Sequence, residues 1–254
     1  MTEATDPRER FSQRAEPYDR GRPGYPAELY TWYRARFRLQ AESVVADVGA
    51  GTGLHTEGLA GIVGRVWAVE PNDRMRDQAR ERFRGATSVR VSPGSAEHMG
   101  LPDASVDLVT AAQAFHWFQP PSFAREVRRV LRRPDSWCLV WNVRNPAGNA
   151  FTAGYEEILH RFGNGYAAIR ESWGDPDRIA EFYGGDVDRR VLPNRQAFDF
   201  DGVEANMASS SYMPSVGAEG WDPVRAALDA LFRRESHGGL IELAYETLVV
   251  TPRR

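Results

Sequence analysis

The sequence predicts an α/β fold with a mostly parallel, doubly wound sheet that carries helices on both faces. Two observations support this class. Short apolar runs, each long enough for one strand, alternate with segments of helical periodicity from residue 27 to residue 143. The first apolar run, at 44–48, is followed at once by glycine at every second position, Gly49, Gly51 and Gly53. Strands separated by helices in this way form parallel sheets that are buried on both faces.

The first half of the chain divides into strands and helices in regular alternation. Pro26 suits the first turn of one helix, and Asn72 is a suitable N-cap for another. The expected helices span residues 27–39, 53–63, 72–83 and 121–131. The expected strands span residues 44–48, 66–69, 89–91, 106–111 and 137–143.

The alternation stops after Asn145. Residues 146–185 are rich in glycine and aromatic side chains, and we expect an insertion of about two helices over one end of the sheet. The later elements are a strand, a helix and a hairpin-like closing strand, at 187–200, 221–234 and 241–251. This organisation predicts three parts. Residues 1–40 are a helical N-terminal lid, residues 41–145 and 186–254 are the sheet domain, and residues 146–185 are a helical cap over the binding site.

Composition narrows the function classes. The chain has 254 residues, enough for one domain with a full core, and a formal net charge of −3, whereas a nucleic-acid-binding protein is expected to be basic. No apolar stretch has the length that spans a bilayer, and residues 1–10 lack the apolar core of a secretory signal, so we expect no membrane association. The single cysteine, Cys138, fits a reduced, cytoplasmic setting. No histidine pair has the spacing of a metal site, so no metal is expected.

The glycine loop narrows the choice of ligand. Glycine lets the backbone turn tightly and lets a ligand approach closely, at the sheet edge where α/β folds bind ligands. The dinucleotide pattern GxGxxG is absent, because Leu54 and Thr56 stand where its third glycine would fall in either register. Glu70 follows Gly53 by 17 residues, at the end of the next expected strand. Its carboxylate is suited to accept hydrogen bonds from both hydroxyls of a ribose.

Four segments together resemble the class I S-adenosylmethionine (SAM)-dependent methyltransferases, in particular the type-11 group that includes enzymes of ubiquinone biosynthesis. They are VVADVGAGTG (44–53), WAVEPNDRM (67–75), SPGSAEHMGLPDASVDLVTAAQAFHWF (92–118) and REVRRVLRRPDSWCLVW (125–141). The sequence departs from the family at Pro134-Asp135-Ser136, where a Pro-Gly-Gly turn is usual. The resemblance implies SAM as cofactor and a Rossmann-like sheet of seven strands, mostly parallel, with the last strand antiparallel.

The resemblance also assigns residues to the methionine and ribose parts of the cofactor. Asp47 and the three glycines of the loop, Gly49, Gly51 and Gly53, would line the methionine part. Glu70, with the adjacent Pro71, would hold the ribose, and Met75 would pack against the adenosine. For Glu70 the alternative is a solvated helix cap, and for Met75 it is a place in the hydrophobic core.

Other positions are assigned to the adenine and to the reactive end of the cofactor. Ser95, Ala96 and Glu97 would meet the adenine, with an ordinary surface position as the alternative for Glu97. Gln113 would lie near the sulfonium. Tyr18 would cover the methionine part, and packing on the sheet edge is the alternative for it.

The chemistry of methyl transfer needs few dedicated residues, because the enzyme mainly aligns the acceptor with an already activated methyl group. A base is needed for a hydroxyl acceptor and not for a carboxylate. His116 is the candidate base because imidazole titrates near neutral pH, and structural packing is its alternative. The aromatic residues expected to shape the acceptor pocket are Phe115, Trp117, Phe118, Tyr155 and Tyr212, and burial in the core under a helix is the alternative for the first three.

We therefore expect a SAM-dependent methyltransferase, monomeric or homodimeric, that acts on a hydroxyl or carboxyl of a small molecule. The many aromatic residues favour a hydrophobic or aromatic acceptor, such as a secondary metabolite. Methylation at nitrogen or carbon is one alternative. Another is a SAM-binding protein of the same fold that catalyses a rearrangement or cyclisation without transferring the methyl group.

Overall fold

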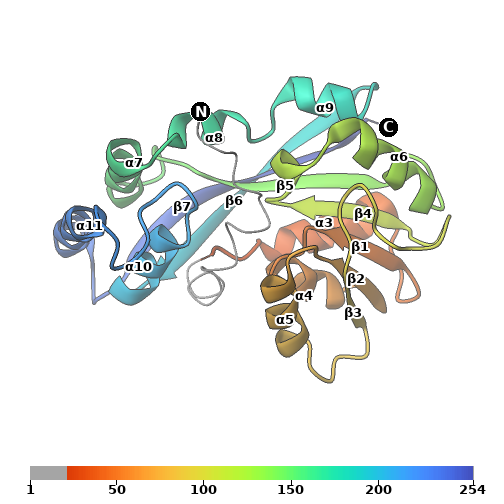
Figure 1. Ribbon diagram of the computed structural model, residues 1–254, viewed down its shortest axis with the longest axis horizontal. Helices are drawn as coiled ribbons and strands as arrows, with labels where there is room; N and C mark the ends of the chain where they lie inside the picture. The colour runs from red at the N-terminus through yellow and green to blue at the C-terminus, as the bar shows by residue number, and fades with distance from the viewer. Residues whose placement is uncertain (1–21, 254) are drawn as a thin grey trace.

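The computed structural model describes residues 22–253, and its centre is a seven-stranded sheet in the order β3-β2-β1-β4-β5-β7-β6 (Figure 1). Across the sheet, the five neighbouring strands β3, β2, β1, β4 and β5 run parallel to one another. Strand β7 pairs antiparallel with both β5 and β6. The expected sheet of seven mostly parallel strands with an antiparallel last strand is confirmed. The strands are β1 (Val44–Val48), β2 (Arg65–Val69), β3 (Val89–Ser92), β4 (Leu108–Ala112), β5 (Trp137–Arg144), β6 (Val187–Phe198) and β7 (Ile241–Pro252).

Helices connect most of these strands, as the alternating sequence pattern predicts. In the first half of the chain they are α3 (Ala27–Phe37), α4 (Leu54–Ala60), α5 (Asp73–Arg82), the 3-10 helix η1 (Phe115–Trp117) and α6 (Pro120–Val130). In the second half they are α7 (Ala150–Phe162), α8 (Tyr166–Glu171), α9 (Pro176–Phe182), α10 (Phe200–Ala208) and α11 (Trp221–Glu235). Within residues 22–253, no helix combines the length and apolar character that crossing a bilayer requires.

Both faces of the central sheet are covered. On one face, α3 and α4 contribute Tyr33 and Leu59 to a buried core. On the other, Phe123 of α6 and Phe182 of α9 stack with 4.9 Å between their ring centroids. Burial from both sides explains why the interior of β1 is apolar, with Asp47 as the one polar side chain in that strand.

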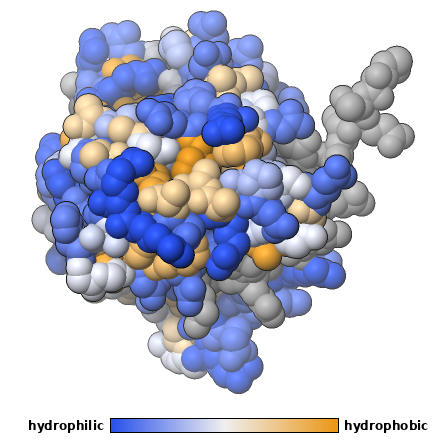
Figure 2. All heavy atoms as spheres, turned by 90° about the vertical axis from the view of Figure 1, so that its left-hand side faces the viewer, coloured by the Kyte–Doolittle hydropathy of each residue, from blue (hydrophilic) through white to orange (hydrophobic). Residues whose placement is uncertain are grey.

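An outer lobe extends the molecule beyond the central strands. It is built around a second core to which α7, α8, α10, α11 and the beginning of β7 contribute (Figure 1). Figure 2 shows the face at this end of the molecule, where an apolar area lies among hydrophilic side chains. The lobe is joined to the sheet by the long antiparallel strands β6 and β7 and by the segment that follows β5.

Two expectations about the second half need correction. Residues 146–185 form three helices, and they do not make a single cap: α7 and α8 pack in the outer lobe, whereas α9 belongs to the central core. The strand expected at 187–200 ends at Phe198, and α10 follows it without having been predicted. Asp199 is the N-cap of α10, since its side chain accepts a hydrogen bond from the amide of Gly202 over 2.8 Å. This capping residue was a local signal of the helix.

Candidate active site

The glycine loop between β1 and α4 folds back onto the end of β2. The amides of Gly49 and Ala50 donate to the carbonyl oxygen of Val69 over 2.9 and 3.1 Å. Gly49 has a φ of 69°, and a Cβ there would lie 2.6 Å from the Cβ of Ala114, so no side chain fits. At Gly51 no heavy atom lies within 4 Å of the Cβ position. The loop therefore packs tightly against the protein at Gly49, whereas space is left beside its backbone at Gly51.

The carboxylate of Glu70, just after β2, is buried and tied to this loop. Its Oε2 accepts a hydrogen bond from the amide of Gly51 and its Oε1 one from the amide of Asn72, both over 2.8 Å. Burial raises the pKa of Glu70, and the two amides and the nearby Arg76 oppose that rise. The side chain points toward the loop and not into solvent. Each of its oxygens keeps a further lone pair for a ligand.

Asp47 places a second carboxylate beside the loop. Its Oδ2 accepts a hydrogen bond from the hydroxyl of Thr56 over 2.6 Å, and its Oδ1 is buried without a hydrogen-bond partner among residues 22–253. Burial raises the pKa of Asp47 to about 7; the charge of Glu70 adds to this rise, and the Thr56 hydrogen bond opposes it. An unsatisfied buried carboxylate oxygen is costly unless a ligand completes it. A cationic group is the partner that suits it best.

A pocket, here called the loop pocket, opens next to these groups. It brings together four of the residues predicted to bind the cofactor, Asp47, Gly49, Gly51 and Gln113. Further side chains line it as well, namely Arg22, Tyr25, His55 and Asn142. Glu70 does not line this pocket itself but reaches its wall through the hydrogen bond to Gly51.

The other residues predicted for the cofactor lie outside the loop pocket, and Tyr18 lies outside the described residues. Met75 is buried in the first turn of α5. Glu97 is half-buried, and its Oε1 accepts a hydrogen bond from the amide of Gln119 over 3.0 Å. The complete set of described residues outside the pocket is Gly53, Glu70, Pro71, Met75, Ser95, Ala96 and Glu97.

Gln113 follows β4 and has an unusual backbone conformation. Its φ is 56°, a left-handed value that is costly for a residue with a side chain and is found most often at functional sites. Its amide donates to the carbonyl oxygen of Val140 over 2.8 Å, and its Nε2 donates to the carbonyl oxygen of Asn142 over 2.9 Å. The ends of β4 and β5 are therefore held together at the mouth of the pocket.

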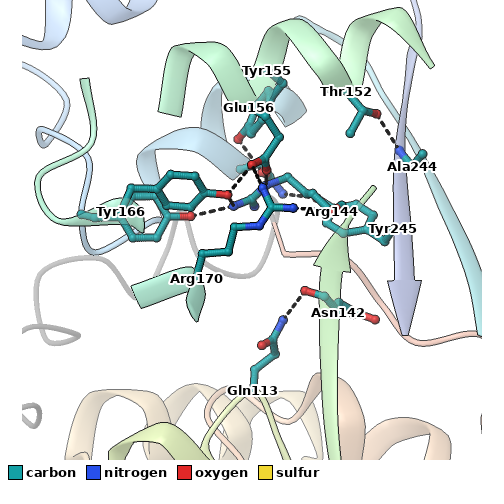
Figure 3. Close-up of polar contacts among 12 residues, drawn as sticks. Gln113, Asn142, Arg144, Thr152, Tyr155, Glu156, Tyr166, Arg170, Ala244 and Tyr245 are labelled. Atoms are coloured by element: carbon teal, nitrogen blue, oxygen red, sulfur yellow. Dashed lines mark hydrogen bonds and ion pairs between the residues drawn. The ribbon is translucent and has the colours of Figure 1, made fainter. Parts of the chain in front are cut away.

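A second pocket, here called the inner pocket, continues from the loop pocket toward the outer lobe. The two share four lining residues, Arg22, Pro23, Gln113 and Asn142. Beyond this shared boundary the lining is mostly polar and includes Arg144 of β5, Asn206 of α10 and Tyr245 of β7. Figure 3 shows Arg144 and Tyr245 near the end of β5. Residues close to the end of β5 thus connect the two pockets.

Arg144, the last residue of β5, is 7% exposed and is surrounded by polar groups of the outer lobe (Figure 3). Its Nε pairs with Glu156 of α7, and its Nη2 donates to the hydroxyls of Tyr212 and Tyr166 over 2.9 and 3.1 Å. Arg170 of α8 forms an ion pair with the other oxygen of Glu156. We refer to Arg144, Glu156 and Arg170 as the arginine cluster.

His116, the candidate base, lies in η1 and lines neither of the two pockets. Its Nδ1 is buried and has no hydrogen-bond partner within residues 22–253. Burial lowers the pKa of His116 to about 3, with further lowering by the charges of Arg22 and Arg178. The imidazole is therefore neutral at pH 7 and weakly basic.

The five aromatic residues predicted for the acceptor pocket line neither pocket. Phe115 and Phe118 are buried in the central core, and Trp117 packs against it. Tyr155 donates a hydrogen bond to Oδ1 of Asn206 over 2.6 Å, and the hydroxyl of Tyr212 accepts one from Arg144. These two tyrosines hold residues of the inner pocket from behind. The packing removes the basis on which an aromatic acceptor pocket was expected.

The sequence interpretation missed the polar half of the site. Asn142 and Arg144 stand at the carboxyl end of an otherwise apolar strand, the same sheet edge at which the glycine loop lies. Polar residues at that position are a usable signal, because ligands of open α/β sheets bind at this edge. Asn206 carried no comparable signal, since the helix that presents it was not predicted.

Comparisons with known proteins agree with this arrangement. A family model described as a methyltransferase domain matches residues 46–140, which include the glycine loop, Glu70 and Gln113. A methyltransferase-like protein of Schizosaccharomyces pombe is 28% identical over 242 residues, covering 94% of this chain and 93% of its own. A methyltransferase of Mycobacterium tuberculosis H37Rv is 39% identical over 135 residues, and the chain spans about half of its length (53%).

A solved structure of a methyltransferase is similar to this protein over nearly the whole fold. A protein from Anaeromyxobacter dehalogenans, described as a type II methyltransferase, superposes with a TM-score of 0.62 at 25% identity. The match covers 91% of this chain and 99% of that chain, so it includes the outer lobe as well as the central sheet.

Proposed function

Because the chain belongs to the class I SAM-dependent methyltransferases, we propose that it transfers a methyl group to an oxygen atom of a small molecule. SAM supplies that methyl group on a positively charged sulfur. The observation that carries the proposal is the placement of Asp47 and Glu70 on either side of the open backbone at Gly51. Two carboxylates and a bare stretch of main chain form a cradle for a cationic nucleoside.

The loop pocket fits the methionine and ribose parts of SAM. Asp47 would pair through its unpartnered Oδ1 with the ammonium group of the methionine part. Glu70 would accept hydrogen bonds from the ribose hydroxyls with the lone pairs that the backbone amides leave free. The open side of Gly51 leaves room for the ligand between them.

The adenosine part would be held by the segments that surround Glu70. We assign Pro71 and Met75 to the ribose and adenosine, and the loop of Ser95, Ala96 and Glu97 to the adenine edge. Gly53 packs directly against the ring of Phe83, and no side chain fits there because a Cβ would lie 2.4 Å from that ring. We assign Tyr18 to the methionine part, whereas α3 packs in the core on one face of the sheet.

The acceptor would enter from the inner pocket and meet the methyl group near Gln113. An acceptor oxygen held there would be the nucleophile for the activated methyl group that bound SAM would supply. Gln113 and Asn142 would fix the acceptor at the boundary of the two pockets. This alignment is the main contribution that the protein makes to the rate.

Of the two oxygen acceptors, the carboxyl group is favoured. A hydroxyl acceptor must lose a proton, and an imidazole whose pKa is about 3 is a weak base for that task. A carboxylate is already ionised at pH 7 and needs no base. The polar lining of the inner pocket also suits a charged acceptor better than an aromatic one.

Radiolabelled SAM and mass spectrometry test this function. We expect the purified protein to bind S-adenosylhomocysteine and to transfer label from SAM to members of a panel of small carboxylic acids, giving alkali-labile methyl esters. Base-stable products would be methyl ethers of a hydroxyl acceptor or products methylated at nitrogen or carbon, which fragmentation in the mass spectrometer distinguishes. Tight binding of SAM with no transfer to any acceptor would contradict the proposal and favour a rearrangement or cyclisation on the same fold.

A further inference from the structure

We propose that the inner pocket binds a carboxylate group of the acceptor and that Arg144 is the residue that holds it. This inference rests on the proposed function, because it specifies the class of substrate that the methyltransferase takes. Arg144 lines the inner pocket at its outer-lobe end, whereas Gln113 and Asn142 mark the end that meets the loop pocket. The anchored carboxylate is therefore at the far end of the pocket from the methyl donor, and it is a different group of the acceptor from the one that is methylated.

The hydrogen bonds of Arg144 leave one side of its guanidinium available. Within residues 22–253 its Nε and Nη2 bind Glu156, Tyr166 and Tyr212, and its Nη1 makes no hydrogen bond. A guanidinium carries five N–H donors, two of them on Nη1. These two donors are the ones left for a ligand in the pocket that Arg144 lines.

The charge of the arginine cluster is not balanced by the protein. Arg144 and Arg170 share the single carboxylate of Glu156, which leaves a net charge of +1. None of the residues that line the inner pocket in the described part of the chain is acidic. The side chain of Arg170 is 29% exposed, so water hydrates part of this excess charge. The positive charge beside the inner pocket still favours an anion over a neutral ligand.

The two tyrosines beside Arg144 hold its guanidinium in place without adding a negative charge. The hydroxyls of Tyr166 and Tyr212 accept its hydrogen bonds, and the two rings pack with 4.8 Å between their centroids. Arginine remains charged at any physiological pH. An immobilised guanidinium loses little conformational entropy when an anion binds, which favours recognition of a particular group.

A carboxylate matches the site better than a phosphate. At the Arg144 end of the pocket the excess charge of one unit is neutralised by a monoanion, whereas a phosphate near neutral pH carries more charge than that. Arg22, the other cation of the lining, lies at the boundary with the loop pocket. Asn206 and Tyr245 add neutral polar groups to the same wall, and the Nδ2 of Asn206 lies 3.3 Å from the hydroxyl of Tyr245. These groups suit hydrogen bonding to the remainder of a small polar acid.

Trifluoroacetate, followed by fluorine NMR line broadening, tests the anion site without knowledge of the natural acceptor. The wild-type protein is first saturated with S-adenosylhomocysteine so that the loop pocket is filled. We expect saturable broadening with trifluoroacetate and none with the neutral trifluoroacetamide. Acetate should compete for the site, and inorganic phosphate should compete at least several-fold more weakly; stronger competition by phosphate would overturn the choice of a carboxylate.

Three variants assign the binding to Arg144. Arg144→Gln removes a charged donor, so trifluoroacetate should bind roughly tenfold to a hundredfold more weakly. The isosteric Glu156→Gln raises the charge of the arginine cluster to +2, so this variant should bind trifluoroacetate more tightly. Arg195→Gln, an exposed residue paired with Glu242, is the matched control and should not change the affinity.

The outcomes separate this inference from the proposed function. If Arg144→Gln binds trifluoroacetate as the wild type does, or if Glu156→Gln binds it no more tightly, the inference is wrong although cofactor binding stands. If the wild-type protein fails to bind S-adenosylhomocysteine, the proposed function itself is wrong. Should Arg144→Gln fail to fold, the comparison of Glu156→Gln with Arg195→Gln still decides the question.

Discussion

The side-chain amide of Gln113 donates a hydrogen bond to the carbonyl oxygen of Asn142 over 2.9 Å, and the two residues lie on the boundary between the loop pocket and the inner pocket. Asn142 is fixed further, because its Oδ1 accepts a hydrogen bond from Thr247 over 2.6 Å. The ends of β4 and β5 and the middle of β7 are thereby held together where the proposed reaction takes place. Most of our predictions concern this boundary and the loop beside it.

Gln113→Ala should reduce methyl transfer while leaving cofactor binding intact. The variant loses one hydrogen bond that positions Asn142, and imperfect alignment of the acceptor lowers kcat. We expect kcat to fall by about tenfold or more and the affinity for S-adenosylhomocysteine to stay close to that of the wild type. Steady-state kinetics and calorimetry measure the two quantities. Gln40→Ala, at an exposed position, is the control, and an equal loss in both variants would refute a role for Gln113.

The pKa of Asp47 predicts that cofactor binding releases a proton. In the free protein the carboxyl group has a pKa of about 7, and pairing with an ammonium group favours its ionised form. Binding at pH 6 should therefore release protons, and the release should vanish above pH 8. Calorimetry in buffers of different ionisation enthalpy measures this number. Asp47→Asn should bind S-adenosylhomocysteine more weakly and release no proton; unchanged release would contradict the assignment.

The same group affects the stability of the free protein. The folded state holds the Asp47 proton up to about pH 7, whereas the unfolded chain loses it near its ordinary pKa of 3.8. The folded state thus binds more protons between these values, so this group makes the free energy of unfolding decrease as the pH rises from 4 to 7. Asp47→Asn removes that contribution. Melting temperatures of the two proteins across this range should diverge toward pH 7, with the variant the more stable.

His116→Gln should change activity little. A general base contributes about 10²–10⁴-fold to the rate, but a carboxylate acceptor needs none and the imidazole is weakly basic. We expect kcat to fall by less than about tenfold. A fall of a hundredfold or more, together with loss of the acid limb of the pH profile, would make His116 the base and the acceptor a hydroxyl.

Gly49→Ala should destabilise the protein and weaken cofactor binding. A left-handed backbone costs an alanine about 1–2 kcal/mol, and the added Cβ would also collide with Ala114 at 2.6 Å. Gly85→Ala is the matched control, because Gly85 has a φ of 84° but open space around it, so only the backbone cost applies. Thermal unfolding should therefore show a larger loss for Gly49→Ala. Equal losses would mean that the contact with Ala114 has no importance.

The central sheet could be predicted from the sequence because burial on both faces produces a local sequence pattern. A strand covered from both sides is a continuous apolar run, and Val44 to Val48 shows this with one carboxylate as the exception. The glycine loop and Glu70 were predictable for a related reason, since their roles depend on a short turn and on the end of the next strand. The structure brings them within hydrogen-bond distance.

The inner pocket could not be predicted in the same way, because it is assembled from distant segments. Arg144, Glu156 and Asn206 meet only after α7 and α10 have packed in the outer lobe. The aromatic residues after 146 suggested a pocket lining, yet most of them became core, since composition does not reveal which side of a helix faces a neighbour. Tyr155 illustrates this: it supports the pocket through Asn206 without lining it.

Calorimetric titration of the protein with S-adenosylhomocysteine, at about 10–50 µM of each component, tests the central claim most directly. We predict binding at one site per chain, and an affinity roughly tenfold to a hundredfold lower in Glu70→Ala because charge-assisted hydrogen bonds are lost. Glu81→Ala, at an exposed position of α5, should bind as the wild type does. Absence of binding to the wild type, or equal affinity in Glu70→Ala, would contradict the account.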